Sequence, residues 1–300
     1  MRRRCCGRNI SAKLRAAKSL FTRKRNPGAV IKKEKKLGRG FVLTRKDNNM
    51  DILSLIEPAR TVAITGAGGK TTLMFDLARR CVRAGKTVIT STTTHIFVPT
   101  AAQSSMTILA SMDPGLQTVR PALLKFMHVT IGLEVDAATG KLRGVDPQLV
   151  RRFDDWADVT IIEADGAAGR SIKAPESWEP VIPANVDLVI FVIGLDALGQ
   201  QVNERTVFRM RRFCDITGLQ EHDVITPDAL VRLAYHPQGG LKGVPLQACF
   251  IVLLNKIDRL RSPDVLETIA AVFEKERPPR QRSRVIAANM MTGEMTVVRE

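Results

Sequence analysis

The feature that most constrains the fold is a glycine-rich loop between an apolar run and a helical pattern. Residues 61–65 read Thr-Val-Ala-Ile-Thr, which predicts a buried strand. A helix is predicted over about 70–84, with apolar positions at Leu73, Phe75, Leu77, Ala78 and Val82. Gly85 suits the end of that helix, and 87–90 predict the next strand. A strand, helix and strand in this order predict parallel pairing.

The same alternation of strand and helix continues along the chain. Further strands are predicted at 106–110, 128–133, 159–164, 187–193 and 249–254, with 285–288 as the last. Helices are predicted near 114–126, 146–156, 205–216, 227–235 and 263–276. Several strands are continuous apolar runs, which are typical of strands covered on both faces. We therefore predict an α/β fold: a three-layer, doubly wound P-loop NTPase-like domain with a mostly parallel sheet, over residues 50–300.

The loop has the chemistry of a phosphate site. Its residues are Gly66, Ala67, Gly68, Gly69, Lys70, Thr71 and Thr72. Glycines let backbone N–H groups approach phosphate oxygens, and the start of a helix adds its positive dipole end. Lys70 would reach the β- and γ-phosphates, and the Thr71 hydroxyl would ligate Mg²⁺. Position 64 is Ile rather than the first Gly of the common G-x-x-x-x-G-K-[ST] pattern, so an ordinary glycine-rich turn is the alternative.

Acids and hydroxyls follow two other predicted strands. Glu163 and Asp165 lie at the end of the strand at 159–164, where a nucleotide site holds Mg²⁺ directly or through water. Thr94 and His95 follow the strand at 87–90, and we treat them with Lys70 and the two acids as catalytic candidates. The alternatives are solvated loop acids, strand threonines and a structural histidine.

A third strand end carries a base-reading motif. Residues 255–258 read Asn-Lys-Ile-Asp after the apolar run at 249–254. The Asp258 carboxylate would accept the N1–H and N2–H₂ donors of guanine, which adenine lacks. Asn255 would contact the base or connect loops, and the Lys256 stem would cover the base. A surface turn is the alternative interpretation.

Charge divides the chain into two parts. Residues 1–49 hold 17 Lys and Arg but 2 Asp and Glu, whereas the rest holds 29 and 28. We expect 1–49 to be a disordered basic extension, or an upstream addition before a natural start at Met50. A basic arm can contact nucleic acid, but the neutral remainder and the 5% aromatic content make nucleic acid an improbable partner of the folded domain.

Cysteine usage and hydropathy set the expected compartment. The chain has five cysteines and none form a C-x₂-C pair, which argues against disulfides or a zinc cluster. No apolar run is long enough for a signal peptide core or a transmembrane helix. We expect a cytoplasmic protein.

Several ordered motifs resemble those of the YqeC family. They are T-G-A-G-G-K-T-T (65–72), S-T-T-T-H-I (91–96), E-A-D-G-A-A-G-R-S-I-K-A-P (163–175), E-P-V-I-P (179–183), G-L-D-A-L-G (194–199), H-P-Q-G-G-L-K-G-V-P (236–245) and L-N-K-I-D (254–258). Members are described as selenium-dependent hydroxylase accessory proteins or selenium cofactor biosynthesis proteins. The resemblance implies a nucleotide-binding protein that takes part in maturing selenium-dependent molybdenum hydroxylases.

Three functional hypotheses remain open from sequence. The first is a Mg²⁺-dependent protein that binds and slowly hydrolyses GTP during maturation of a metal cofactor. The second is an ATP- or GTP-dependent ligase or transferase that activates a small acid, because G-x-x-G-K-T-T is shared with the Mur ligases. The third is a nucleic-acid-binding protein that uses the basic arm. Arg170 and Lys173 are candidates for neutralising phosphate charge, and the glycine loop with His236 and Lys242 is a candidate lid.

Overall fold

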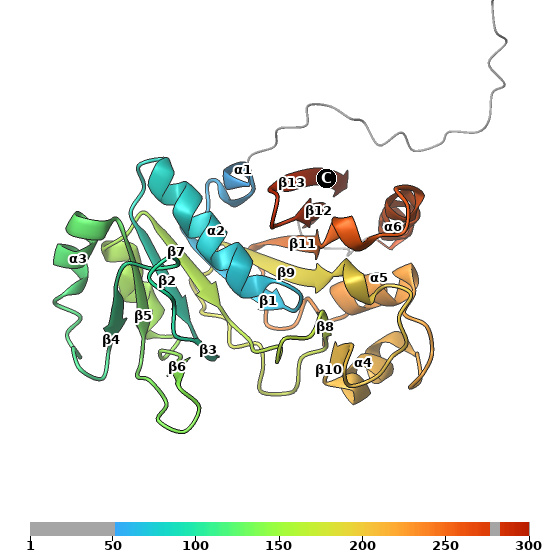
Figure 1. Cartoon of the computed structure of the whole chain (residues 1–300), viewed down its shortest axis with the longest axis horizontal. Coiled ribbons are helices and arrows are strands. Elements are labelled where there is room, and N and C mark those ends of the chain that lie inside the picture. The colour runs from blue at the N-terminus through green and yellow to red at the C-terminus, as the bar shows by residue number, and fades with distance from the viewer. Residues whose placement is uncertain (1–51, 277–282, 300) are drawn as a thin grey trace, which may run out of the picture. The chain divides into compact units, whose positions relative to one another are not determined.

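A nine-stranded sheet organises the part of the chain that is described. The computed structural model describes residues 52–276 and 283–299 (Figure 1). The strand order is β13-β12-β11-β9-β1-β7-β2-β5-β4, and every neighbouring pair is parallel except β12 and β13. The strands are β1 (Thr61–Gly66), β2 (Val88–Thr92), β4 (Thr107–Leu109), β5 (His128–Gly132), β7 (Val159–Glu163), β9 (Leu188–Gly194), β11 (Cys249–Asn255), β12 (Ser283–Asn289) and β13 (Glu294–Arg299). The predicted α/β fold with a mostly parallel sheet is confirmed.

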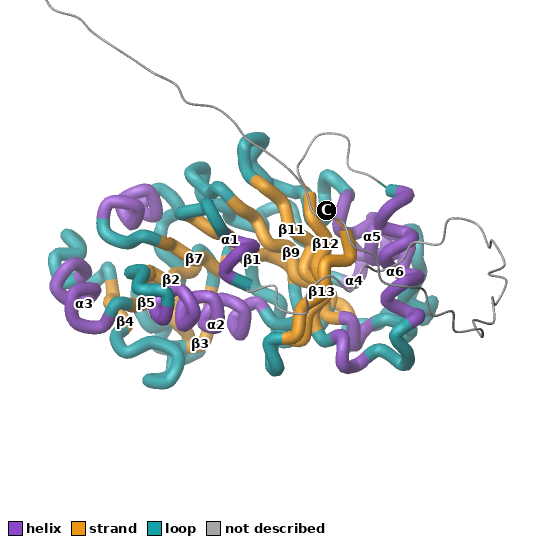
Figure 2. Tube along the Cα trace, turned by 90° about the horizontal axis from the view of Figure 1, so that it is seen from above, coloured by secondary structure: helices purple, strands orange, loops and turns teal. Residues whose placement is uncertain are grey.

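Helices cover both faces of this sheet (Figure 2). They are α1 (Leu53–Ile56), α2 (Lys70–Arg83), α3 (Val119–Phe126), α4 (Met210–Thr217), α5 (Pro227–Tyr235) and α6 (Asp264–Lys275). Alternate residues of one strand belong to different layers, as a pleated strand requires. Val62 and Ile64 of β1 pack with α1 and α2, whereas Ala63 between them packs in the cluster that includes α4, α5 and α6. This confirms the three-layer arrangement.

Three predicted helices differ from the structure, and the one predicted at 114–126 begins only at Val119. Residues 146–156 contain a 3₁₀ helix, η1 (Leu149–Asp155), in which Val150 and Phe153 are both fully buried. Their spacing of three residues matches the 3₁₀ period. The predicted helix at 205–216 begins only at Met210, because Val207–Phe208 form the short strand β10 and Arg209 adopts a left-handed φ of 64°.

Five further strands were not predicted. β13 follows the strand that sequence placed last, after a turn at Gly293. β10 pairs with β8 (Ile172–Lys173), and β3 (His95–Phe97) pairs with β6 (Lys141–Arg143). β3 directly follows β2, and β8 is the strand after β7. The two small sheets therefore extend from the carboxyl ends of β2 and β7, where the site lies.

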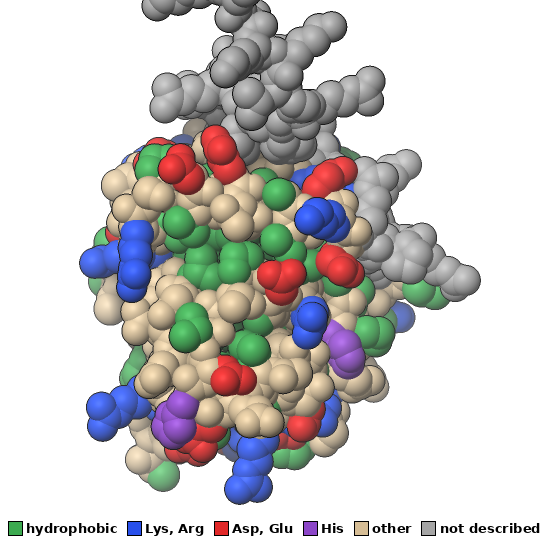
Figure 3. Space-filling model, turned by 90° about the vertical axis from the view of Figure 1, so that its right-hand side faces the viewer, with side chains coloured by type: hydrophobic (Ala, Val, Ile, Leu, Met, Phe, Trp, Pro, Cys, Tyr) green, Lys and Arg blue, Asp and Glu red, His purple; other side chains and the backbone are tan. Residues whose placement is uncertain are grey.

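The basic segment at 1–49 lies outside the described residues. On the side of the molecule shown in Figure 3, acidic and basic side chains of the described residues are interspersed. Within the described residues, no helix combines the length and apolar composition that crossing a bilayer requires.

Candidate functional site

The loop after β1 is shaped by three glycines. Gly66, Gly68 and Gly69 have φ values of 87°, 90° and 129°, a region that residues with a Cβ rarely adopt. A Cβ at Gly68 would lie 2.5 Å from the Gly194 nitrogen, and one at Gly69 would lie 2.4 Å from Asn255 Nδ2. The loop is thus held tightly between the ends of β9 and β11. The first N–H groups of α2, which follow it, have no acceptor within the helix.

Not every amide of the loop is available to a ligand. Ala67 is buried, and its N–H donates to the Val192 carbonyl at 2.8 Å. The Gly66 N–H donates to Asp165 Oδ2 at 3.1 Å. These two residues therefore fix the loop to β9 and to the acidic segment after β7. The amides from Gly68 to Thr72 are the better candidates for phosphate contact.

Lys70 is the central cation of the site. Its ammonium is nearly buried, donates to the Gly66 carbonyl at 2.8 Å, and lies 3.3 Å from Asp165 and 3.6 Å from Glu163. Burial lowers the pKa of Lys70, but Asp165 and Glu163 more than offset this, so the pKa lies above its usual value. The lysine therefore stays charged beside the loop.

Glu163 and Asp165 both face the loop from the end of β7. The Thr71 hydroxyl donates to Glu163 Oε2 at 2.7 Å. Burial raises the pKa of the Glu163 carboxyl, against the attraction of Lys70. Asp165 Oδ1 is buried without a hydrogen-bond partner, although Lys70 lies near it. A hydroxyl and two carboxylates that converge in this way form the oxygen donor set that suits Mg²⁺.

A second lysine completes a buried charge network. Lys173 on β8 is fully buried and binds Asp165 at 3.1 Å, Glu179 at 2.6 Å and the Gly166 carbonyl at 2.6 Å. Its ammonium therefore balances acids of the protein, which differs from the predicted task of neutralising phosphate. Arg170 likewise binds the carbonyls of Glu204 and Ala168.

A cleft of about 1100 Å³ opens from the loop and the acids. Thr94 and His95 line it, as do the loop residues from Gly68 to Thr72. The Thr94 N–H donates to Thr92 Oγ1 at 3.0 Å, which orders the turn after β2. His95 is exposed at the start of β3. The structure thus brings both residues to the same cleft as Lys70, while their catalytic roles remain predictions.

The Asn-Lys-Ile-Asp segment lies on another side of the loop. Asn255 Nδ2 donates to the Gly68 carbonyl at 2.8 Å, so this residue connects β11 to the loop. Lys256 binds Asp196 at 2.7 Å, and Asp258 is exposed with its carboxylate 3.1 Å from Arg259. These residues line a second cavity of about 330 Å³, which also includes Gly69 and Thr72. The loop therefore borders both cavities.

Sequence reasoning missed the residues that support the loop from β9. Gly194 lies so close to Gly68 that a Cβ on Gly68 would clash with its nitrogen, and a Cβ on Gly194 would lie 2.7 Å from Asp196 Oδ1. Asp196 also accepts from Ser171 Oγ at 2.8 Å. The signal was the glycine that ends the apolar run of β9, directly before Leu195 and Asp196. Conversely, the candidate lid at 236–242 is packed elsewhere: Gly239 and Gly240 are buried against the last turn of α5, and neither lines these cavities.

The strand order, the loop and its helix define the class: a three-layer α/β protein with a phosphate-loop-type site at the carboxyl ends of its strands. The family described as "YqeC protein" matches residues 62–211. A curated relative, "Uncharacterized protein YqeC" of Escherichia coli (strain K12), is 38% identical over 197 residues, which cover 63% of this chain and 72% of the relative. The chain belongs to the YqeC family, as its motifs predict.

Solved structures with the same kind of fold show low overall similarity. One is "FlhF complexed with GMPPNP/Mg(2+)", with a TM-score of 0.39 and 15% identity, covering 80% of this chain and 70% of that one. Another is the Signal Recognition Particle 54 kDa protein from Aeropyrum pernix K1 in complex with GDP, with a TM-score of 0.34 and 18% identity, covering 79% and 43%. The fold assignment rests on the strand order described above.

Proposed function

We propose that this protein binds a Mg²⁺–nucleoside triphosphate, GTP in preference to ATP, and hydrolyses it slowly. The observation that carries the proposal is the loop at 66–72, with its three left-handed glycines and the buried, charged Lys70. Backbone N–H groups at the start of α2 would bind the phosphates, and the Lys70 ammonium would bind the β- and γ-phosphates.

The donor set beside Lys70 fits Mg²⁺. Thr71 would hold the ion, with Glu163 and Asp165 holding it directly or through water. Among residues 52–276 and 283–299, no three His, Cys, Asp or Glu side chains form a metal cluster, and Mg²⁺ sites of this kind use few protein ligands beside phosphates and water. When bound, the ion would neutralise charge on the phosphates.

Hydrolysis would depend on positioning and charge, because phosphoryl transfer requires little covalent help. Lys70 would stabilise negative charge that develops on the phosphates. Thr94 and His95, which line the same cleft, are the candidates for orienting the attacking water.

The smaller cavity supports the guanine preference. It begins at the loop and contains Asn255, Lys256 and Asp258, so a nucleotide with its phosphates on the loop would place its base there. Asp258 would accept the two guanine donors, whereas adenine would leave that carboxylate without them.

The direct test of phosphate binding is a Lys70→Ala variant titrated with Mg²⁺–GTP by calorimetry. Loss of the cation should weaken binding by about 100–1000-fold, or ~3–4 kcal/mol, as for other single groups that stabilise phosphate or oxyanion charge. Arg83→Ala, at the far end of the same helix, is the matched control and should bind as the wild type does. Equal affinity of Lys70→Ala and wild type would remove the loop from the proposal.

The base preference has its own test. GTP and ATP are competed against a labelled guanine nucleotide, and GTP should displace it more effectively. Asp258→Asn should lose the preference for guanine and favour xanthine, because an amide offers xanthine the donor that a carboxylate lacks. If ATP competes as well as GTP does, Asp258 does not read the base.

The biological role follows from the family resemblance: an accessory function in maturing a selenium-dependent molybdenum hydroxylase. Deleting the gene in its own organism should lower the selenium content of such a hydroxylase, measured by elemental analysis of the purified enzyme. Unchanged selenium content would contradict this role while leaving nucleotide binding intact.

A second candidate function is a ligase or transferase that uses ATP or GTP to activate a small acid. The size of the larger cleft favours it, because the phosphates and the metal border only one part of its wall. Hydrolysis that depends on an added small acid would support this alternative.

A further inference from the structure

The larger cleft extends away from the smaller cavity. Both cavities include Gly69, Thr72 and Lys256, so the loop lies between them. A nucleotide whose base occupies the smaller cavity would direct its terminal phosphate into the cleft of about 1100 Å³. The remaining wall of that cleft is built from β3, β6 and two segments near 178 and 208. The side chains of this remaining wall therefore indicate what kind of second ligand the cleft binds.

That wall exposes aromatic side chains. Phe97 on β3 is 75% exposed and Trp178 is 65% exposed, and both line the cleft. Phe208 of β10 joins them there. A large aromatic side chain typically buries roughly 150–250 Å² of its surface in a contact. Two such side chains exposed in one cleft therefore mark a binding surface.

Each aromatic surface carries a cation. The Arg209 guanidinium lies 4.6 Å from the Phe208 ring centroid and 5.4 Å from that of Trp178. The Lys141 ammonium lies 5.1 Å from the Phe97 centroid. Cations stacked on aromatic faces combine a flat apolar contact with donors for an anion.

Arg209 keeps capacity for such an anion. Its Nε is buried and faces Glu179 Oε1 at 3.5 Å, so the terminal N–H groups of the guanidinium are the ones that a ligand would reach. Glu179 in turn binds Lys173 at 2.6 Å, so its charge is already shared with a fully buried ammonium. The guanidinium has five N–H donors, and one shared carboxylate does not occupy them.

We propose that this wall binds a second small ligand: a planar aromatic molecule that carries a carboxylate or a phosphate. Its ring packs against Trp178 and Phe97, and its anionic group binds Arg209 and Lys141. The inference rests on the proposed function, because it is the nucleotide in the smaller cavity that leaves this wall to a second ligand. The same two cations would bind either a carboxylate or a phosphate, and a probe of each kind distinguishes the two.

The test uses the full chain with Mg²⁺–GTP present and titrates simple probes by calorimetry. The anionic probes are 2-naphthoate and 1-naphthyl phosphate, which separate the two kinds of anion. 2-Naphthalenemethanol lacks the charge, and cyclohexanecarboxylate lacks the aromatic ring. At least one anionic aromatic probe should bind 10-fold or more tightly than both of these controls.

Arg209→Asn is the sharpest variant. Asparagine tolerates the left-handed φ and is a favoured residue at the start of a helix, so the change removes the guanidinium and keeps the backbone. It should weaken the anionic probe at least 10-fold, and Trp178→Ala should do the same. Arg211, which is exposed, lies two residues further along the chain and does not line the cleft, so Arg211→Asn should leave probe binding unchanged. Circular dichroism confirms that each variant is folded.

Three results would overturn the inference: equal binding of charged and uncharged probes, unchanged binding by the folded Arg209→Asn protein, or displacement of the probe by a single-stranded oligonucleotide at far lower concentration. If the wild-type protein binds Mg²⁺–GTP but no anionic aromatic probe, this inference is wrong and the proposed function stands. If it binds the probe but no nucleotide, the proposed function is wrong.

Discussion

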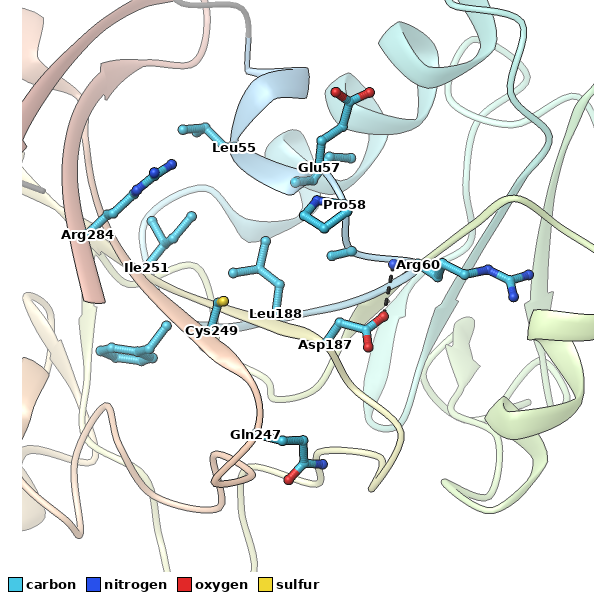
Figure 4. Close-up of a pocket in the computed structure, with 13 residues that line it drawn as sticks. Leu55, Glu57, Pro58, Arg60, Asp187, Leu188, Gln247, Cys249, Ile251 and Arg284 are labelled. Atoms are coloured by element: carbon cyan, nitrogen blue, oxygen red, sulfur yellow. Dashed lines mark hydrogen bonds between the residues drawn. The ribbon is translucent and has the colours of Figure 1, made fainter. Parts of the chain in front are cut away.

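The two ends of the parallel strands differ in how far their charged side chains are exposed to solvent. At the carboxyl ends, Lys70, Glu163, Asp165 and Lys173 are each at most 5% exposed. At the amino ends a cavity of about 530 Å³ has an apolar floor, and its charged residues lie at its margin (Figure 4). Those residues, which include Glu57, Arg60, Asp187 and Arg284, are all exposed.

Burying a charged group costs on the order of several kcal/mol per ion. The attraction within one buried ion pair is of about the same size, so the two effects nearly cancel. Two lysines and two carboxylates at the carboxyl ends therefore do not raise stability above that of an apolar core of the same shape. Their concentration beside a glycine loop indicates a task in binding or catalysis. The exposed charges at the amino ends carry no such implication.

The largest effect is expected for Lys173→Met. The change keeps most of the side-chain volume but leaves Asp165 and Glu179 buried without this cation. The expected loss of unfolding free energy is about 3–5 kcal/mol, the usual result of removing one partner of a buried pair. Urea denaturation at pH 7 measures it.

Arg284→Met provides the matched change at the other end of the sheet. This arginine is exposed and lines the amino-end cavity, so its replacement should change stability by less than about 0.5 kcal/mol. Similar losses in the two variants would mean that the two ends do not differ as described.

His128 shows what happens to a buried ionisable group at the amino end. It begins β5, and its Nε2 lies 3.0 Å from Thr90 Oγ1. Burial lowers the pKa of His128 from 6.5 to about 4. The folded protein thus keeps this residue neutral, whereas Lys70 at the carboxyl end is kept charged.

The pH dependence has a definite sign. The folded state binds the His128 proton less readily than the unfolded state, so stability is full above about pH 6.5 and falls as pH approaches 4. The total loss is about 3 kcal/mol, since one pKa unit corresponds to ~1.4 kcal/mol. In urea denaturation, His128→Gln should lack this part of the decline between pH 6.5 and 4.5. Parallel curves for the two proteins would show that His128 is not held neutral.

The layers and the mostly parallel pairing were predictable because local patterns indicate them, whereas the strand order was not predicted. Continuous apolar runs such as 188–193 identify buried strands, and the glycine loop fixes where the first helix begins. The region after 200 was less predictable: the apolar spacing suits a helix, but the left-handed Arg209 interrupts it and β8 pairs with Val207. Both causes are tertiary and leave little trace in local sequence.

For the candidate site, sequence predicted the groups but not their connections. Lys70, Glu163 and Asp165 were expected at the carboxyl ends of parallel strands, where ligands collect. The pairing of Lys173 with Asp165 and Glu179 joins separate loops, and the contact of Gly194 with Gly68 joins β9 to the loop. Contacts of this kind depend on how loops fold back over the sheet, and residue spacing does not encode that.

A smaller loss of stability than that of Lys173→Met is expected for Asp187→Ala at the amino end. One oxygen of this exposed carboxylate accepts the N–H groups of Arg60 and Thr61, both at 2.9 Å, and so fixes the start of β1 (Figure 4). Losing these hydrogen bonds should lower the unfolding free energy by about 1–2 kcal/mol, since water can replace part of them. Asp187→Asn retains an acceptor and should lose less. The affinity for Mg²⁺–GTP should stay unchanged in both variants, and a marked decrease would show that the two ends of the sheet are coupled.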